Sequence, residues 1–240
     1  MKKKLSFKLK YSILVFLTLC FFSAYSQKTD STRYPFSKWT PDVLKAASVN
    51  QDITYMTAEE KKVIFLMNLA RMNGKLFCQT YAQMYFDQQD TVDYKNRYVS
   101  TLIDELEKLP KLPPFKCDKD LYESSHSHAV DMGISGKIGH TNYTKRMAAA
   151  NKKFATTGEN CDYGNNDALE IVMSLLIDED VYDFGHRRNI FDKEYSYTAV
   201  SIQPHKEFEY NCVMDFGGGT AYAHNTKPVK KKNLFSRNKK

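Results

Sequence analysis

Two short motifs constrain the fold of this 240-residue chain more than any other feature. The first is Gly158-Glu159-Asn160, and the second reads Gly-His-Arg-Arg-Asn-Ile at positions 185–190. Between them, apolar residues recur at helical spacing behind an N-cap at Asn166 or Asp167. The spacing predicts an amphipathic helix between the two motifs. Its inward-facing residues would be Ala168, Ile171, Val172, Leu175 and Leu176.

Two earlier segments extend this pattern. Positions 68–71 read Asn-Leu-Ala-Arg and resemble an N-x-x-R sequence, and the stretch from Leu121 to Met132 resembles a helix of the form L…A-x-x-H-S-x-D-M. Together with the two motifs, these segments resemble the CAP superfamily, the cysteine-rich secretory, antigen 5 and pathogenesis-related 1 proteins that share the SCP domain. The resemblance implies an α+β fold, a CAP-type α-β-α sandwich with a small central antiparallel sheet.

Capping residues and apolar spacing predict the remaining elements. Thr57 and Glu60 form a capping box that starts one helix, and Asp118 caps another. Helices that come first and a small sheet that comes late favour an α+β domain. The other predicted elements are helices over 76–86, 99–109 and 144–151, strands Thr198–Ile202 and Phe208–Phe216, and a turn at 204–206.

The first 26 residues have the features of a secretory signal peptide. A lysine-rich start precedes an apolar run that reaches Phe22, and Ala24-Tyr25-Ser26 supplies small residues before a cleavage site at Gln27. An uncleaved anchor is the alternative, but the run is shorter than the roughly 20 residues that a membrane span needs. A lipoprotein signal at Cys20 is disfavoured because Leu19 is too large for the preceding position.

The chain is therefore divided into four parts, and no transmembrane anchor is expected after cleavage. The parts are a signal peptide (1–26), an N-terminal extension (27–55), a CAP/SCP domain (56–220) with an insertion at about 75–116, and a basic C-terminal tail (221–240).

The formal charge of +7 comes from the two ends of the chain. Five lysines lie in the signal peptide, and seven basic residues without an acid lie in 227–240, which leaves −5 for residues 27–226. A nucleic-acid-binding domain carries its positive charge on the fold, so this class of function is excluded. The tail is predicted to be a solvated end, with contact to anionic envelope lipid or polymer as the alternative.

Four cysteines remain in the mature chain: Cys78, Cys117, Cys161 and Cys212. Export to an oxidising compartment and an even count predict disulfides. The segment after the first motif is expected beside the final strand, which favours a Cys161–Cys212 bond. The second bond, Cys78–Cys117, would bracket the insertion.

The resemblance implies two histidines and two acids in one central cleft. The matching residues are His140, Glu159, Asp178 and His186, with Glu179 as the neighbouring alternative to Asp178. Imidazole nitrogens and carboxylate oxygens bind divalent ions, zinc above all. Without an ion, the same four side chains would form charge-assisted hydrogen bonds. His128, on the apolar stripe of its helix, is predicted to be a hydrogen-bonded core histidine.

The sequence favours an exported, monomeric binding module, secreted or periplasmic, for an unknown small ligand, lipid or cell-envelope component. Its cleft would take a divalent ion, with Zn²⁺ the first candidate. One alternative is a metal-assisted hydrolase of peptide or cell-wall bonds with Glu159 as general base. Another is an adhesive envelope protein that uses its basic tail. The sequence contains no GxSxG or HExxH motif, so serine hydrolase and zincin chemistry have no support.

Overall fold

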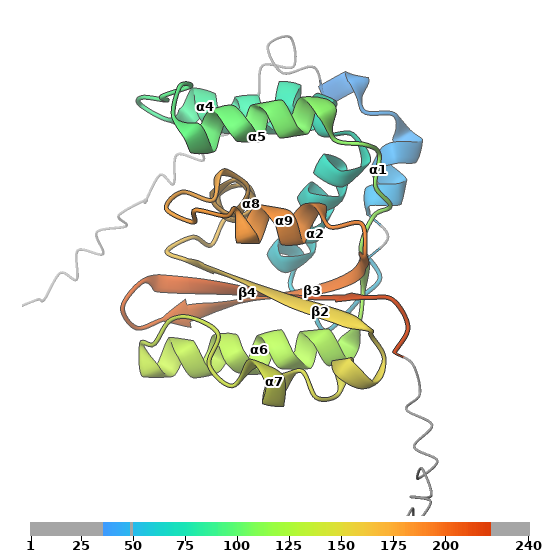
Figure 1. Ribbon diagram of the computed structural model, residues 1–240, viewed down its shortest axis with the longest axis vertical. Helices are drawn as coiled ribbons and strands as arrows, with labels where there is room; N and C mark the ends of the chain where they lie inside the picture. The colour runs from blue at the N-terminus through green and yellow to red at the C-terminus, as the bar shows by residue number, and fades with distance from the viewer. Residues whose placement is uncertain (1–35, 49, 222–240) are drawn as a thin grey trace, which may run out of the picture. The chain divides into compact units, whose positions relative to one another are not determined.

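The computed structural model describes residues 36–48 and 50–221 (Figure 1). The predicted signal peptide, with its alternatives, and almost all of the basic tail lie outside the described residues. No helix within the described ranges is long and apolar enough to cross a membrane.

A four-stranded sheet forms the middle layer, in the order β1-β3-β4-β2. β3 and β4 form a long antiparallel hairpin, and β2 pairs antiparallel with β4 along its full length. The short β1 runs parallel to β3, so the sheet is mixed rather than purely antiparallel. The strands are β1 (Lys116–Cys117), β2 (Thr156–Tyr163), β3 (Tyr195–His205) and β4 (Glu209–Gly218).

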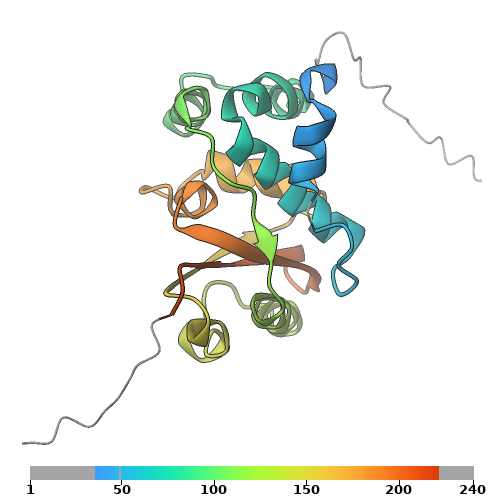
Figure 2. The same ribbon diagram turned by 90° about the vertical axis from the view of Figure 1, so that its right-hand side faces the viewer.

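Helices cover both faces of this sheet, as the α+β prediction required. α6 (Lys119–Ser135) and the short α7 (Tyr143–Arg146) lie on one side (Figures 1 and 2). α2 (Ala58–Met72), α8 (Ala168–Ile177) and α9 (Gly185–Phe191) lie on the other. The remaining helices lie beyond them: α1 (Pro41–Ala47), α3 (Gly74–Phe77), a π-helical turn (Cys78–Ala82), α4 (Gln83–Gln88) and α5 (Arg97–Lys108). Two 3-10 turns complete the helical elements of the described residues. One (Phe36–Lys38) precedes α1, and the other (Ala150–Lys152) precedes β2.

Local capping explains where the main helices begin. Thr57 and Glu60 form the predicted capping box, in which Oε2 of Glu60 accepts from the backbone N–H of Thr57 at 2.7 Å. Asp118 caps α6 and Asp167 caps α8 through their carboxylates, also as predicted. α1 was not predicted, although Thr40 caps it and Pro41 fits its first turn.

Two buried polar side chains of α2 hold distant segments together. Asn68 accepts from the backbone N–H of Phe115 at 2.7 Å. Arg71 is fully buried and donates to the carbonyls of Ile190 at 2.7 Å and Tyr195 at 3.0 Å. Because these bonds replace the water that buried polar groups lose, α2 fixes the end of α9 and the start of β3.

The disulfide prediction is wrong, since all four described cysteines are free thiols. In the β2–β4 register Cys161 lies opposite Val213, whereas Cys212 lies opposite Asp162. Neighbouring positions along a strand point to opposite faces, so the two sulfur atoms are separated by the sheet. Cys78 lies in the π-helical turn, and Cys117 contacts the sulfur of Met56 instead, at 3.9 Å.

Candidate functional site

The edge strand β2 directs its side chains alternately to the two helical layers. Glu159 and Cys161 face α6, where Cys161 packs with Ala129 and Met132. Asn160 faces the opposite layer and donates to the carbonyl of His186 in α9 at 2.9 Å. The first motif therefore contributes polar side chains to both faces of the sheet at its edge.

His140 and Glu159 form the first acid–histidine pair. Nδ1 of His140 lies 2.8 Å from Oε1 of Glu159, and the His140 ring is 52% exposed while the carboxylate is buried. Arg146 of α7 binds the same carboxylate with both ends of its guanidinium, at 2.6 and 3.0 Å. Burial alone would raise the pKa of Glu159, but the hydrogen bonds from His140 and Arg146 outweigh burial and lower it to about 2. Glu159 is therefore an anion held in a fixed orientation.

Asp215 of β4 lies directly opposite Glu159 in the sheet register and is fully buried. Burial and the neighbouring Glu159 charge raise the pKa of Asp215 well above its usual value. A neutral Asp215 avoids two like charges side by side in a medium of low dielectric.

Asp178 and His186 form the second pair. α8 ends at Ile177, and Asp178 follows in the left-handed conformation with φ 59°. One carboxylate oxygen lies 2.7 Å from Nδ1 of His186, and the other accepts from the backbone N–H groups of His186 and Arg187 at 2.9 and 3.2 Å. Asp178 thus caps α9 and orients the His186 ring at the same time.

Arg187, the next residue in the second motif, connects the end of α8 to neighbouring helices. Its buried guanidinium donates to the carbonyl of Ile177 at 2.9 Å and to that of Tyr98 in α5 at 2.9 Å. A cation at the carboxyl end of a helix satisfies carbonyls that have no intrahelical donor. Arg187 therefore joins α8, α9 and α5 around Asp178.

No hydrogen bond or ion pair joins one acid–histidine pair to the other within the described residues. The connection runs through the two motif asparagines: Asn189 donates to Oδ1 of Asn160 at 2.8 Å. Cys161 also lies between the two pairs: its sulfur is 3.8 Å from Nδ1 of His140, and the residue is among those that line a cavity with Asp178 and His186. The structure places the four predicted residues in two separate acid–histidine pairs, and the cavity beside the second pair is lined by Asp178 and His186 but not by His140 or Glu159.

The cavity beside the second pair has a volume of about 390 Å³ and an acidic lining that includes Glu170 and the exposed Glu179. Asp162 of β2 also lines it and is buried, and burial raises the pKa of Asp162 to about 6. Tyr85 of α4, from the segment predicted to be an insertion, also lines this cavity.

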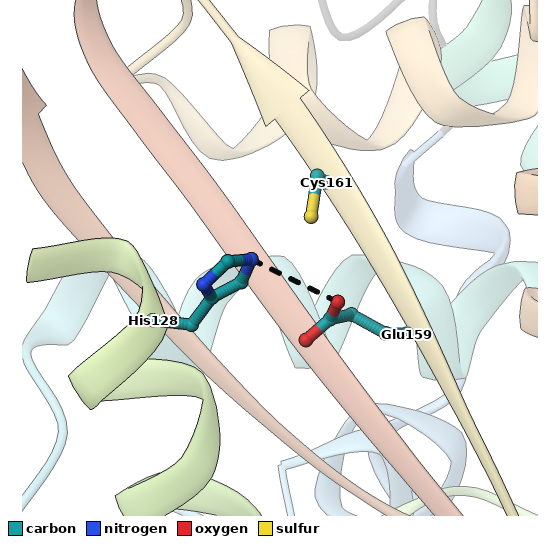
Figure 3. A group of neighbouring side chains, drawn as sticks. All are labelled: His128, Glu159 and Cys161. Atoms are coloured by element: carbon teal, nitrogen blue, oxygen red, sulfur yellow. Dashed lines mark ion pairs between the residues drawn. The ribbon is translucent and has the colours of Figure 1, made fainter. Parts of the chain in front are cut away.

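A compact group of three potential metal ligands occurs within the described residues: His128, Glu159 and Cys161 (Figure 3). Their ligand atoms lie within 4.8 Å of one another, so the group could hold a metal ion. Each ligand is already engaged, however. Nε2 of His128 lies 2.7 Å from the carbonyl of Gly139, and Arg146 occupies both oxygens of Glu159. The pKa of the Cys161 thiol is raised, mainly by burial. An ion at this site would therefore have to displace the hydrogen bonds of His128 and Glu159 and the thiol proton of Cys161.

Sequence reasoning missed Arg146 and Asp215. Arg146 lies in a one-turn helix outside every recognised motif, and Asp215 alternates with Met214 and Phe216 in a strand that is buried on both faces. His128 is buried and hydrogen-bonded. No signal in the sequence indicated that His128 lies within 3.9 Å of Glu159.

Comparison with known families is consistent with the two motifs. The sequence profile of the family described as "CAP: Cysteine-rich secretory protein family" matches residues 68–216. A search of curated proteins finds no match.

Three proteins are among the solved structures that resemble this chain. They are an extracellular protein of Bacillus anthracis that contains an SCP domain (19% identity, 51% of this chain and 39% of that chain, TM-score 0.38), an outer surface protein of Borrelia burgdorferi (18%, 53% and 96%, TM-score 0.39), and a cysteine-rich secretory protein of Staphylococcus aureus (17%, 54% and 41%, TM-score 0.37). The chain thus spans about two fifths of the length of two of these proteins and nearly all of the third.

Proposed function

The chain belongs to the CAP family of cysteine-rich secretory proteins, and on that premise we propose that it is an exported binding module whose cleft takes a divalent ion through His140 and His186. The observation that carries the proposal is the matched geometry of the two pairs. In both, a buried carboxylate lies against Nδ1, at 2.8 Å for Glu159 and 2.7 Å for Asp178.

This geometry leaves Nε2 of each ring available to ligate a metal ion, because neither Nε2 has a hydrogen-bond partner among the described residues. Histidines that bind metals usually donate their other ring N–H to a carboxylate, which fixes the tautomer and raises the basicity of the ligating nitrogen. Glu159 and Asp178 would then orient the ligands rather than ligate the ion. A bound Zn²⁺ would supply Lewis acidity and a fixed positive charge to a ligand in the cleft.

The hydrolase alternative receives less support. A general base works best with a pKa near the operating pH, and Glu159 has a pKa of about 2 with both oxygens engaged. Binding is therefore favoured over turnover.

Zinc-linked stability tests the proposal. Thermal unfolding of the secreted protein is measured at pH 7.5 with and without saturating ZnCl₂, and affinity is measured by equilibrium dialysis. We expect zinc to raise the melting temperature, because an ion bound only by the folded state stabilises it by mass action. His140→Ala and His186→Ala should each weaken binding about tenfold or more, whereas the control His126→Gln should not. Unchanged melting of the wild type, or full affinity in both alanine variants, would refute the ion site.

We further propose that the protein is extracytoplasmic, acts as a monomer and binds a small ligand, lipid or envelope component. The lysine-rich start, the apolar run and the small residues before Gln27 support export. Cell fractionation with N-terminal sequencing tests this proposal, and an intact Met1 on cytoplasmic protein would contradict it.

A further inference from the structure

The cavity beside Asp178 and His186 contains more negative charge than the second acid–histidine pair uses. Three further carboxylates line it, those of Asp162 in β2, Glu170 in α8 and Glu179 in the loop after α8. None of these three forms an ion pair within the described residues, and the lining includes no described lysine or arginine. The cavity therefore presents negative charge to whatever enters it.

Asp162 is the most deeply buried of the three carboxylates. Its residue is 4% exposed, whereas Glu170 is half-buried and Glu179 is exposed. The two oxygens of Asp162 accept from the amide of Asn165 at 3.0 and 3.2 Å. A neutral amide satisfies hydrogen bonding but does not compensate the charge, and a buried charge without an opposite charge is costly. A cation in the cavity would offset this cost.

The phenol of Tyr85 indicates that the three carboxylates converge. Tyr85, in α4, lines the same cavity, and its pKa is raised by burial first and then by the negative charges of Glu170, Asp162 and Glu179. Because the interaction between charges weakens with distance, all three carboxylates lie around this one side chain. The face of a tyrosine ring also attracts cations.

Apolar side chains form another part of the lining. Leu175 and Ile177 of α8 and Val181 of the following loop contribute to it. The volume of about 390 Å³ is typical of small-molecule sites. Within the described ranges, the three carboxylates do not form a group of ligand atoms within 4.8 Å of one another, so they are too far apart to coordinate a second metal ion together. The cavity suits an organic cation with a short hydrocarbon chain.

We propose that this cavity binds a small aliphatic diamine. One ammonium group would pair with Asp162, and the other would lie with Glu170 and Glu179 on the more exposed side. The methylene chain would pack on the apolar walls, and the ring of Tyr85 would contact the ligand. This inference rests on the proposed function, since it gives the ligand class of that binding module, but it requires no metal ion.

Titration calorimetry with 1,5-diaminopentane tests the proposal. The buffer is freed of zinc with a chelating resin and has physiological ionic strength, at which pairing with scattered surface carboxylates is screened. We expect one diamine to bind per chain. Pentane-1,5-diol, which has the same length without charge, and 1-aminopentane, which has a single charge, should each bind at least about tenfold more weakly.

Two variants locate the site. Asp162→Asn and Glu170→Gln should each weaken the binding of 1,5-diaminopentane about tenfold. The matched controls Asp104→Asn and Glu123→Gln each remove one charge from a side chain outside the cavity, 76% and 64% exposed, and should bind like the wild type. Asp162→Asn removes a buried charge and should leave the folded protein more stable at neutral pH, so weaker binding in this variant cannot come from misfolding. Melting curves verify the folding of every variant.

Equal affinities for the diamine and the diol would overturn the recognition of charge. An equal affinity for 1-aminopentane would overturn the second ammonium contact and with it the assignment of a diamine. Affinities in Asp162→Asn and Glu170→Gln that match the controls would overturn the location. Stabilisation by zinc without any diamine binding would overturn this proposal alone, whereas diamine binding without stabilisation by zinc would support it and overturn the ion site.

Discussion

Asn189 donates a hydrogen bond to Oδ1 of Asn160 at 2.8 Å, which joins the asparagines of the two sequence motifs across the sheet edge. Asn160 is fully buried, and its own amide donates to the carbonyl of His186. The bond therefore fixes β2, which carries Glu159, relative to α9, which carries His186. The two acid–histidine pairs depend on this contact for their relative position.

Replacing Asn189 should destabilise the fold and loosen both pairs. Asn189→Ala leaves the buried Oδ1 of Asn160 without its side-chain donor, a loss of about 1–3 kcal/mol. Urea unfolding measures the change, and Asn166→Ala, at an exposed loop position, serves as the control. An Asn189→Ala variant as stable as the control would show that the contact contributes nothing.

Asp162→Asn should stabilise the protein at neutral pH. Burial raises the pKa of Asp162 to about 6 from a usual value near 3.8, so the folded state holds this proton more tightly than the unfolded state. Stability is therefore lost as the pH rises from about 4 to 6, and the deficit persists above pH 6. We expect a gain of about 1–3 kcal/mol at pH 8 and little difference at pH 4.

The exposed Asp104→Asn provides the reference for this comparison. Urea unfolding at both pH values checks the prediction. A gain of the same size at pH 4 and pH 8 would contradict a titration origin.

The four described cysteines should react as thiols once the chain is unfolded. Burial raises the pKa of Cys78 to about 11, and burial foremost raises that of Cys117 to about 12, while Cys161 and Cys212 are buried. Since the thiolate is the reactive form, alkylation at pH 8 should be slow in the native protein and complete in guanidinium without reductant. Intact mass counts the adducts. Two or fewer adducts within residues 36–221 would show that a disulfide is present after all.

Gly133→Ala should disturb the packing of α6 against the segment that connects β3 and β4. The added Cβ would lie 2.1 Å from the backbone oxygen of Pro204, and neither backbone segment can yield easily, so a loss of about 1–3 kcal/mol is expected. Ser135→Ala, two residues along the same helix, is the matched control in a thermal melt. An unchanged melting temperature in Gly133→Ala would mean that the turn shifts without cost.

Much of the fold follows from local sequence. The capping residues Thr57, Asp118 and Asp167 identify three helix starts because a side chain bonds its own backbone a few residues away. The alternation of β3 and β4 likewise reflects a two-residue period. By contrast, β1 is two residues long and exists only because it pairs with β3.

The sequence alone determined the family, most of the helical regions, the β3–β4 hairpin, and which histidines and acids belong to the motifs. It could not determine side-chain direction across the sheet. Cys161 and Cys212 were predicted to bond, yet a register offset of one residue separates them to opposite faces. Arg146, which helps to lower the pKa of Glu159, and Asp215, whose pKa Glu159 raises, come from distant segments that meet only when β2, β4 and α7 are packed together. Such contacts depend on register and packing between elements, and neither property is encoded within any one segment of the chain.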